Sequence, residues 1–246
     1  MIKKLAIGIV SLGIASAAMA TTYNGNGATG FGGTLGNGSL TLTDDGTTIS
    51  GTFTAGSAFN DTLVLYIDST STGANITSTA GLTDTADGGR KSISAFDGTN
   101  RATINLPIAA DFALMLSPTQ NSFGGLWSLS NGANLPFVAS ANMTNIGNAG
   151  PTSYNFTINL ADLGLTAGQS FNFVADYLNG SNAFLSNETL NGTTGLGGTN
   201  PGQNTTSTLA GFQTYTTTAP IPEPATVLLV GPAILGGMFF LRRRRA

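Results

Sequence analysis

Between residues 21 and 220 the chain consists of short apolar or alternating segments separated by turn-forming residues, and no helical period lasts for more than two turns. Residues 154–160 alternate strictly between apolar and polar side chains, as a half-buried strand does. Residues 62–68 are apolar on both faces, which is typical of a covered central strand. Roughly eight to eleven such strands with frequent turns predict an all-β fold, an antiparallel β-sandwich.

The predicted sandwich spans residues 39–190. The preceding residues 21–38 are rich in Gly and Asn, and we expect a flexible lead-in or loose edge hairpins there. Residues 191–220 are rich in Gly, Thr and Asn and are predicted to form a linker or stalk, in which residues 211–216 are either a last strand or the start of the stalk. Within the sandwich, residues 161–165 indicate a single helical turn closed by Gly164.

The N-terminal residues 1–20 have the pattern of a secretory signal peptide. Two lysines precede a short apolar region, and Ala18 and Ala20 occupy the minus-three and minus-one positions of a cleavage site after Ala20. The alternative is an N-terminal membrane anchor that is not cleaved. Cleavage implies export of the following residues by Sec-type machinery.

The C-terminal residues 221–246 contain a second targeting pattern. Pro222, Glu223 and Pro224 precede an uncharged apolar run, residues 225–241, which is about 25 Å long as a helix and predicts a single transmembrane helix. The chain then ends with a basic cluster, which the positive-inside rule places in the cytoplasm: Arg242, Arg243, Arg244 and Arg245. A buried core helix and a permanent tail anchor are the alternatives.

This order of Pro-Glu-Pro, apolar run and terminal arginines resembles the PEP-CTERM sorting signal of exported bacterial proteins. The resemblance implies that an integral membrane enzyme, exosortase, recognises Pro222–Pro224, removes the tail, and releases the body or attaches it at the cell surface. The chain would then be anchored in the inner membrane during sorting and would later be at the cell surface or extracellular.

Removing both ends leaves an acidic body. Residues 21–220 keep three basic and eleven acidic residues, a net charge of −8, which excludes a surface able to neutralise a run of phosphates. Nucleic-acid binding is therefore not expected. The chain has no cysteine, so no disulfide stabilises the fold.

A second resemblance covers residues 58–190. The body is similar to sugar-binding sandwich modules of the family-nine carbohydrate-binding and DOMON-like type, in segments 60–68, 111–114, 160–165, 171–177 and 186–190. Such modules stack sugars on exposed aromatic rings, and Trp127 is the only tryptophan of the chain. Trp127 is therefore the candidate ligand-binding residue, although core packing is the more ordinary role of a large aromatic side chain.

Catalysis is not expected. The chain has neither histidine nor cysteine, which excludes Ser-His, Cys-His and histidine-ligated zinc chemistry. A carboxylate pair for glycoside hydrolysis remains an alternative, and Glu188 is the only glutamate between residues 21 and 220. No cofactor is expected; turn carboxylates make Ca²⁺ the one metal to consider, at Asp44, Asp45, Asp84, Asp87 and Asp97.

These patterns predict a non-catalytic, exported protein of the bacterial surface or extracellular matrix, with a structural or adhesive role in a biofilm or floc. Its expected partners are the export machinery, exosortase and the membrane. The alternative function is a carbohydrate-binding module at the cell surface, whose partner would be an extracellular polysaccharide.

Overall fold

Strand β4 (Thr62–Asp68) lies within a seven-stranded antiparallel sheet that forms the middle layer of the fold. The computed structural model describes residues 19–69, 73–150 and 152–219, and every residue of β4 except Asp68 is buried. Burial on both faces confirms the prediction of a covered central strand. The sheet has the order β12-β11-β4-β7-β8-β9, and its other strands are β7 (Phe112–Ser117), β8 (Phe123–Ser128), β9 (Phe137–Ser140), β11 (Ser170–Asn179), β12 (Phe184–Thr189) and β14 (Gln213–Thr216).

Strand β11 pairs with three other strands. One of its edges pairs with β4 along residues 172–178. The opposite edge is shared, because β14 pairs with residues 170–173 and β12 with residues 176–179. The last strand of the described chain is therefore part of the central sheet.

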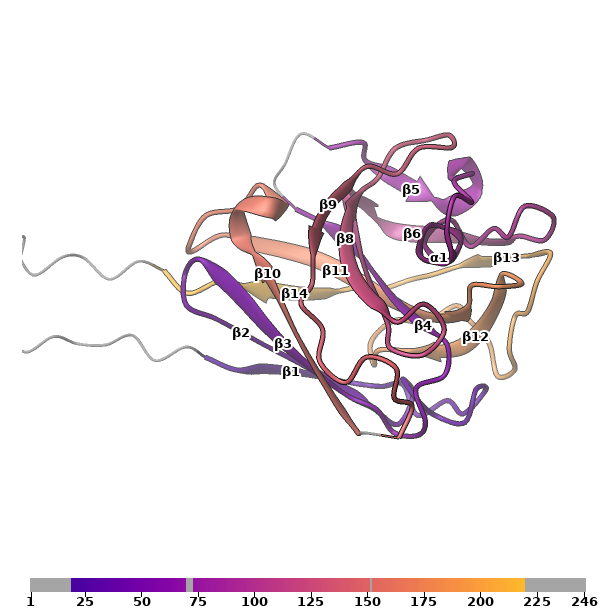
Figure 1. The fold of residues 1–246 in the computed structure, drawn as a ribbon, viewed down its shortest axis with the longest axis horizontal. Helices are drawn as coiled ribbons and strands as arrows, with labels where there is room; N and C mark the ends of the chain where they lie inside the picture. Colours follow the sequence, from indigo (N-terminus) through magenta and orange to yellow (C-terminus); the bar gives the residue numbers. More distant parts are fainter. Residues whose placement is uncertain (1–18, 70–72, 151, 220–246) are drawn as a thin grey trace, which may run out of the picture. The chain divides into compact units, whose positions relative to one another are not determined.

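A four-stranded antiparallel sheet covers one face of the central sheet (Figure 1). Its order is β1-β2-β3-β10, and its strands are β1 (Thr21–Asn24), β2 (Ser39–Asp44), β3 (Thr48–Thr54) and β10 (Ser153–Asn159). Buried and accessible residues alternate along β2, β3 and β10, as a sheet with one solvated face requires. The alternation expected for residues 154–160 is confirmed, with Tyr154, Phe156 and Ile158 in the core.

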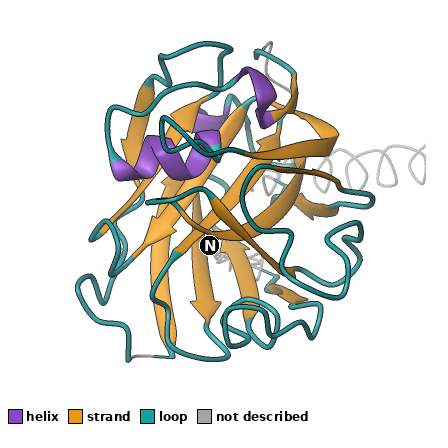
Figure 2. Cartoon of the chain, turned by 90° about the vertical axis from the view of Figure 1, so that its right-hand side faces the viewer, coloured by secondary structure: helices purple, strands orange, loops and turns teal. Residues whose placement is uncertain are grey.

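A third layer covers the other face of the central sheet. It contains β5 (Ile76–Ser78), β6 (Ala102–Ala110) and β13 (Thr205–Thr208), together with the 3₁₀ turn η1 (Thr79–Gly81) and the helix α1 (Gly88–Ser94). Strand β13 pairs with β6 in parallel, unlike the antiparallel pairs elsewhere in the described strands. Figure 2 shows these short helical segments in purple beside the strands in orange.

The expectation of an all-β fold is confirmed, and the architecture is sandwich-like with a covering layer on each side of the central sheet. The predicted helical turn is present as η2 (Leu160–Leu163). It ends at Gly164, whose φ of 69° is in the left-handed region.

The segments on either side of the predicted sandwich differ from expectation. Residues 21–38 are not a flexible lead-in, because β1 pairs with β2 at the edge of a sheet and Leu35 is fully buried. Residues 191–219 are not a stalk, because β13 and β14 pair with β6 and β11; the alternative of a last strand within residues 211–216 is confirmed by β14. The folded unit therefore extends to both ends of the described chain.

Candidate binding cleft

A cleft of about 510 Å³ lies between the start of α1, the β7–β8 turn, β8 and β9. Its apolar wall consists of Met115, Phe123, Trp127 and Phe137. The ring of Trp127 makes edge contacts with Phe123 and Phe137, with centroid distances of 6.1 and 5.5 Å. These three aromatic rings therefore form one packed cluster along the cleft.

Glycines make room for this cluster. A Cβ atom on Gly125 would lie 2.7 Å from the ring of Phe123, 3.0 Å from Trp127 and 3.1 Å from Phe137. A Cβ atom on Gly89, in α1, would lie 2.7 Å from the side chain of Met115. The aromatic rings thus pack directly over the backbone of β8, and the side chain of Met115 on β7 packs over the backbone of α1, at positions that carry no side chain.

Trp127 and Phe137 differ in their accessibility. Trp127 is 2% exposed and belongs mainly to the core, although its ring lines the cleft. Phe137 is 49% exposed, so it offers a free aromatic surface. Within the described residues the indole N–H of Trp127 has no hydrogen-bond partner.

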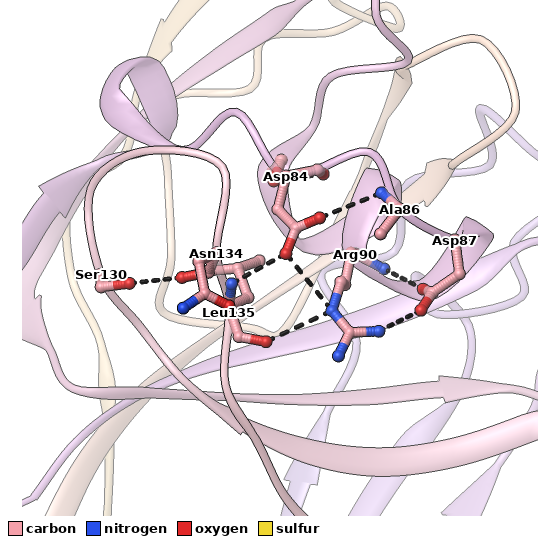
Figure 3. A network of polar contacts seen from close by, with 8 residues as sticks. Asp84, Ala86, Asp87, Arg90, Ser130, Asn134 and Leu135 are labelled. Carbon is pink, nitrogen blue, oxygen red and sulfur yellow. Dashed lines mark hydrogen bonds and ion pairs between the residues drawn. The ribbon is translucent and has the colours of Figure 1, made fainter.

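The polar wall is built around Arg90 (Figure 3). Its Nε lies 3.3 Å from Oδ2 of Asp84 and donates to the carbonyl oxygen of Leu135 at 3.3 Å. Its Nη1 forms an ion pair with Oδ2 of Asp87. Its guanidinium carbon is also 6.0 Å from the centroid of Trp127, at the outer range of a cation–π contact.

Asp84 and Asp87 hold Arg90 in different ways. The Asp84 side chain is 4% exposed and also accepts hydrogen bonds from the backbone N–H groups of Ala86 and Leu135, at 3.0 and 2.8 Å (Figure 3). Asp87 caps α1 by accepting from the backbone N–H of Arg90 at 2.8 Å, and its side chain is 48% exposed. Arg90 is therefore fixed from behind by a buried carboxylate and from the side by an accessible one.

Unused polar atoms remain on this wall. No hydrogen bond of Nη2 of Arg90 to another described residue is found, and Figure 3 shows this nitrogen without a dashed contact. An ionised carboxylate has about four acceptor sites, so Asp87 can accept further hydrogen bonds. Asn121 and Ser122 complete the wall; the amide of Asn121 donates to Ser117 Oγ at 3.0 Å. The cleft thus has one aromatic side and one side with positioned donors and acceptors.

The structure agrees only in part with the predicted site. Trp127 does line a cleft, but the exposed aromatic residue is Phe137, which was not among the predicted site residues. Arg90 and Asn121 were also missed. An aromatic residue directly after Pro136, in a short strand without other large side chains, was the available signal for Phe137.

Asp84 and Asp87 meet at Arg90, but the candidate calcium ligands do not form a metal site, since the described residues contain no group of three or more His, Cys, Asp or Glu side chains placed to hold a metal ion. Asp45 accepts from Thr47 and Thr48 within its own turn, which lowers its pKa to about 2. Asp97 likewise accepts from Thr99 and Asn100. Asp44 is buried and accepts a hydrogen bond from the backbone N–H of Thr218, near the C-terminal end of the described unit. Asp84 and Asp87 form ion pairs with Arg90.

Glu188, the one glutamate of the body, is fully buried and lies away from the cleft. Its two carboxylate oxygens accept four backbone N–H groups, from Phe31, Gly33, Leu35 and Gly36. A carboxylate surrounded in this way stabilises the fold and is closed to a substrate.

Asp176, on β11, is a second fully buried carboxyl group. Neither of its oxygens has a hydrogen-bond partner within the residues that the structure describes. Burial away from water disfavours the charged form and raises its pKa from 3.8 to about 7.

The targeting residues lie almost entirely outside the described residues. This applies to Ala18, to the motif Pro222–Pro224, to the predicted helix 225–241 and to Arg242–Arg245, while Ala20 is exposed at the start of the described chain. In the part of the chain that is described, no helix has the length and apolar character needed to span a membrane.

Comparison of the chain with protein-family models, curated proteins and solved structures finds no match in any of the three.

Proposed function

We propose that this chain is an exported, non-catalytic protein of the bacterial surface or extracellular matrix, and that its folded unit gives it an adhesive role. The observation that carries the adhesive role is the cleft, which is lined both by the exposed Phe137 and by the positioned polar groups of Arg90 and Asp87. Pockets of this kind, an apolar wall with a few fixed polar groups, are typical of small-ligand binding.

A saccharide is the ligand class that suits both walls. One face of a pyranose ring presents mainly C–H groups, which pack against an aromatic ring, and its hydroxyl groups are both donors and acceptors. Phe137 supplies the ring, Arg90 supplies donors, and Asp87 supplies acceptors. The carbohydrate-binding alternative is thereby part of the same proposal, as the means of adhesion.

The carboxylates support binding rather than hydrolysis. Glycoside hydrolysis needs two carboxyl groups on either side of the scissile bond, one of them able to donate a proton. Asp87 lines the cleft and Asp84 does not, and both carboxylates pair with the same arginine. Glu188 is enclosed by backbone N–H groups in another part of the fold.

Saccharide binding is tested with the full-length chain, purified in a detergent that has no sugar headgroup, on an array of polysaccharide fragments. We expect saturable binding that Phe137→Ala removes. Phe212→Ala is the matched control, because Phe212 is 46% exposed and lies outside the cleft. Trp127→Ala is a poorer test, because Trp127 is also a core residue.

Export and sorting form the second part of the proposal, and the pattern at the two chain ends supports them. The test is deletion of Pro222–Pro224, followed by fractionation of cells into cytosol, membrane, surface and medium. We expect the native chain at the surface or in the medium, and the deletion variant retained in the membrane. An intact native chain found in the cytosol would contradict export.

A further inference from the structure

The charges that line the cleft restrict which saccharides it can accept. Asp87 and Arg90 are the charged residues among those that line it, and their side chains are 48% and 24% exposed. They carry opposite charges and form an ion pair. Asp84 adds a negative charge, but its side chain is 4% exposed and is not part of the cleft lining.

A charged sugar would be at a disadvantage on this surface. The carboxylate of a uronic acid next to Arg90 would also lie beside Asp87, and Arg90, Asp84 and Asp87 together carry a net charge of −1. An ammonium group of an amino sugar next to Asp87 would lie beside Arg90 and would compete with it for the same carboxylate. Like charges placed next to each other reduce affinity and select against the wrong partner.

Neutral hydroxyl groups fit the same atoms without this conflict. Nη2 of Arg90 is free to donate, and Asp87 can accept, and both belong to one ion pair on one turn of chain. Two neighbouring hydroxyl groups of a sugar could therefore accept from Arg90 and donate to Asp87 at the same time. Hydrogen bonds to charged groups are stronger than those between neutral groups, so the ion pair provides affinity as well as orientation.

Resting on the proposed saccharide function, we infer that the cleft binds an uncharged pyranose. One face of this sugar lies on Phe137, and its neighbouring hydroxyl groups bind the Arg90–Asp87 pair. The apolar wall supplies the stacking surface, and the fixed position of Arg90 between Asp84, Asp87 and Leu135 lowers the ordering cost of binding.

The experiment is isothermal titration calorimetry of the full-length chain with three oligosaccharides of equal length: a neutral glucan, an oligogalacturonide and a chitosan fragment. We expect the neutral glucan to bind at least about tenfold more tightly than the oligogalacturonide, because like charges placed next to each other at an interface weaken binding by at least that factor. The glucan should also bind more tightly than the chitosan fragment, whose ammonium groups must compete with Arg90 for Asp87. The affinity for the glucan should change by less than about twofold between low and physiological salt, because a neutral ligand has no net charge to screen.

Two variants locate the effect. Phe137→Ala should weaken neutral glucan binding by about tenfold or more, whereas Phe212→Ala should not change it. Asp87→Asn keeps a helix-capping side chain and removes the negative charge beside Arg90, so binding of the oligogalacturonide should become tighter.

The outcomes separate the inference from the proposed function. Tighter binding of a charged fragment to the native chain overturns the inference and leaves saccharide binding intact. Unchanged glucan affinity in Phe137→Ala overturns the assignment of the sugar to this cleft. Failure of all three fragments and of the polysaccharide array overturns saccharide binding itself, and with it the inference.

Discussion

The carboxylate of Glu188 accepts a hydrogen bond of 2.8 Å from the backbone N–H of Leu35, a residue 153 positions earlier in the chain. The N–H groups of Phe31, Gly33 and Gly36 donate to the same carboxylate, so one buried side chain organises the loop between β1 and β2. Gly33 has a φ of 85°, which a residue with a side chain rarely adopts. A Gly-rich segment with few apolar residues is thereby ordered by hydrogen bonds to a charge.

Glu188→Gln should lower the free energy of unfolding by roughly 3–5 kcal/mol, since it removes the charge and places an amide donor among backbone donors. Urea denaturation followed by tryptophan fluorescence measures this difference. Asp162→Asn is the control, because the Asp162 side chain accepts only an exposed hydrogen bond from Asn159. A loss of less than about 1 kcal/mol in Glu188→Gln would contradict the organising role of this carboxylate.

Asp44 should hold the C-terminal end of the described unit in place. Its Oδ2 accepts from the Tyr215 hydroxyl at 2.7 Å, and both of its oxygens accept from the Thr218 backbone N–H, at 2.9 and 3.0 Å. In Asp44→Ala we expect amide hydrogen exchange of residues 214–218 to accelerate by at least about tenfold. Without the hydrogen bonds to Asp44, local opening of this segment costs less free energy.

The matched control for that experiment is Asp45→Asn. Asp45 is the next residue but binds only Thr47 and Thr48 of its own turn, so exchange of residues 214–218 should stay at the native rate. If these amides exchange at the native rate in Asp44→Ala, the pairing of β14 with β11 is sufficient to protect them without Asp44.

Asp176 should make the protein less stable as the pH rises from about 4 to about 7. Burial raises its pKa from 3.8 to about 7, so across this window the unfolded chain has lost the proton and the folded chain still holds it. Stability then falls on the order of 1.4 kcal/mol per pH unit and levels off above pH 7. The pKa of Asp45 is lowered to about 2, so this residue increases stability as the pH rises. That increase is complete by about pH 4 and therefore lies below the window for Asp176.

The measurement is the urea unfolding free energy at several pH values for the native chain and for Asp176→Asn. The difference between the two should change steeply between pH 4 and 7, because contributions common to both chains cancel. The absolute stability of Asp176→Asn does not matter for this test. A difference that is the same at every pH would mean that Asp176 ionises normally in the folded state.

Gly51→Ala should destabilise the fold although the alanine needs no unusual backbone angles. Gly51 lies on β3 opposite Phe156 of β10, and a Cβ atom there would lie 2.0 Å from the ring of Phe156. We expect a loss of roughly 1–3 kcal/mol from overpacking. Gly198→Ala is the control, because a Cβ atom at Gly198 meets nothing within 4 Å; thermal unfolding of both variants compares them, and equal melting temperatures would rule out this clash.

Much of the strand content could be predicted, because it follows from local patterns. Burial on both sides of β4 follows from a run of apolar residues, and the end of η2 follows from Gly164. The cleft could not be predicted in the same way. Arg90, Trp127 and Phe137 come from α1, β8 and β9, and their separate segments give no sign that they meet.

The sequence by itself determined the alternation of apolar and polar side chains, the acidic charge of the body and the absence of histidine and cysteine. Only the tertiary structure decided that residues 21–38 and 191–219 belong to the folded unit. The physical reason is that these segments bury few apolar side chains. They are ordered instead by strand pairing and by hydrogen bonds to Glu188 and Asp44, whose partners are more than a hundred residues away.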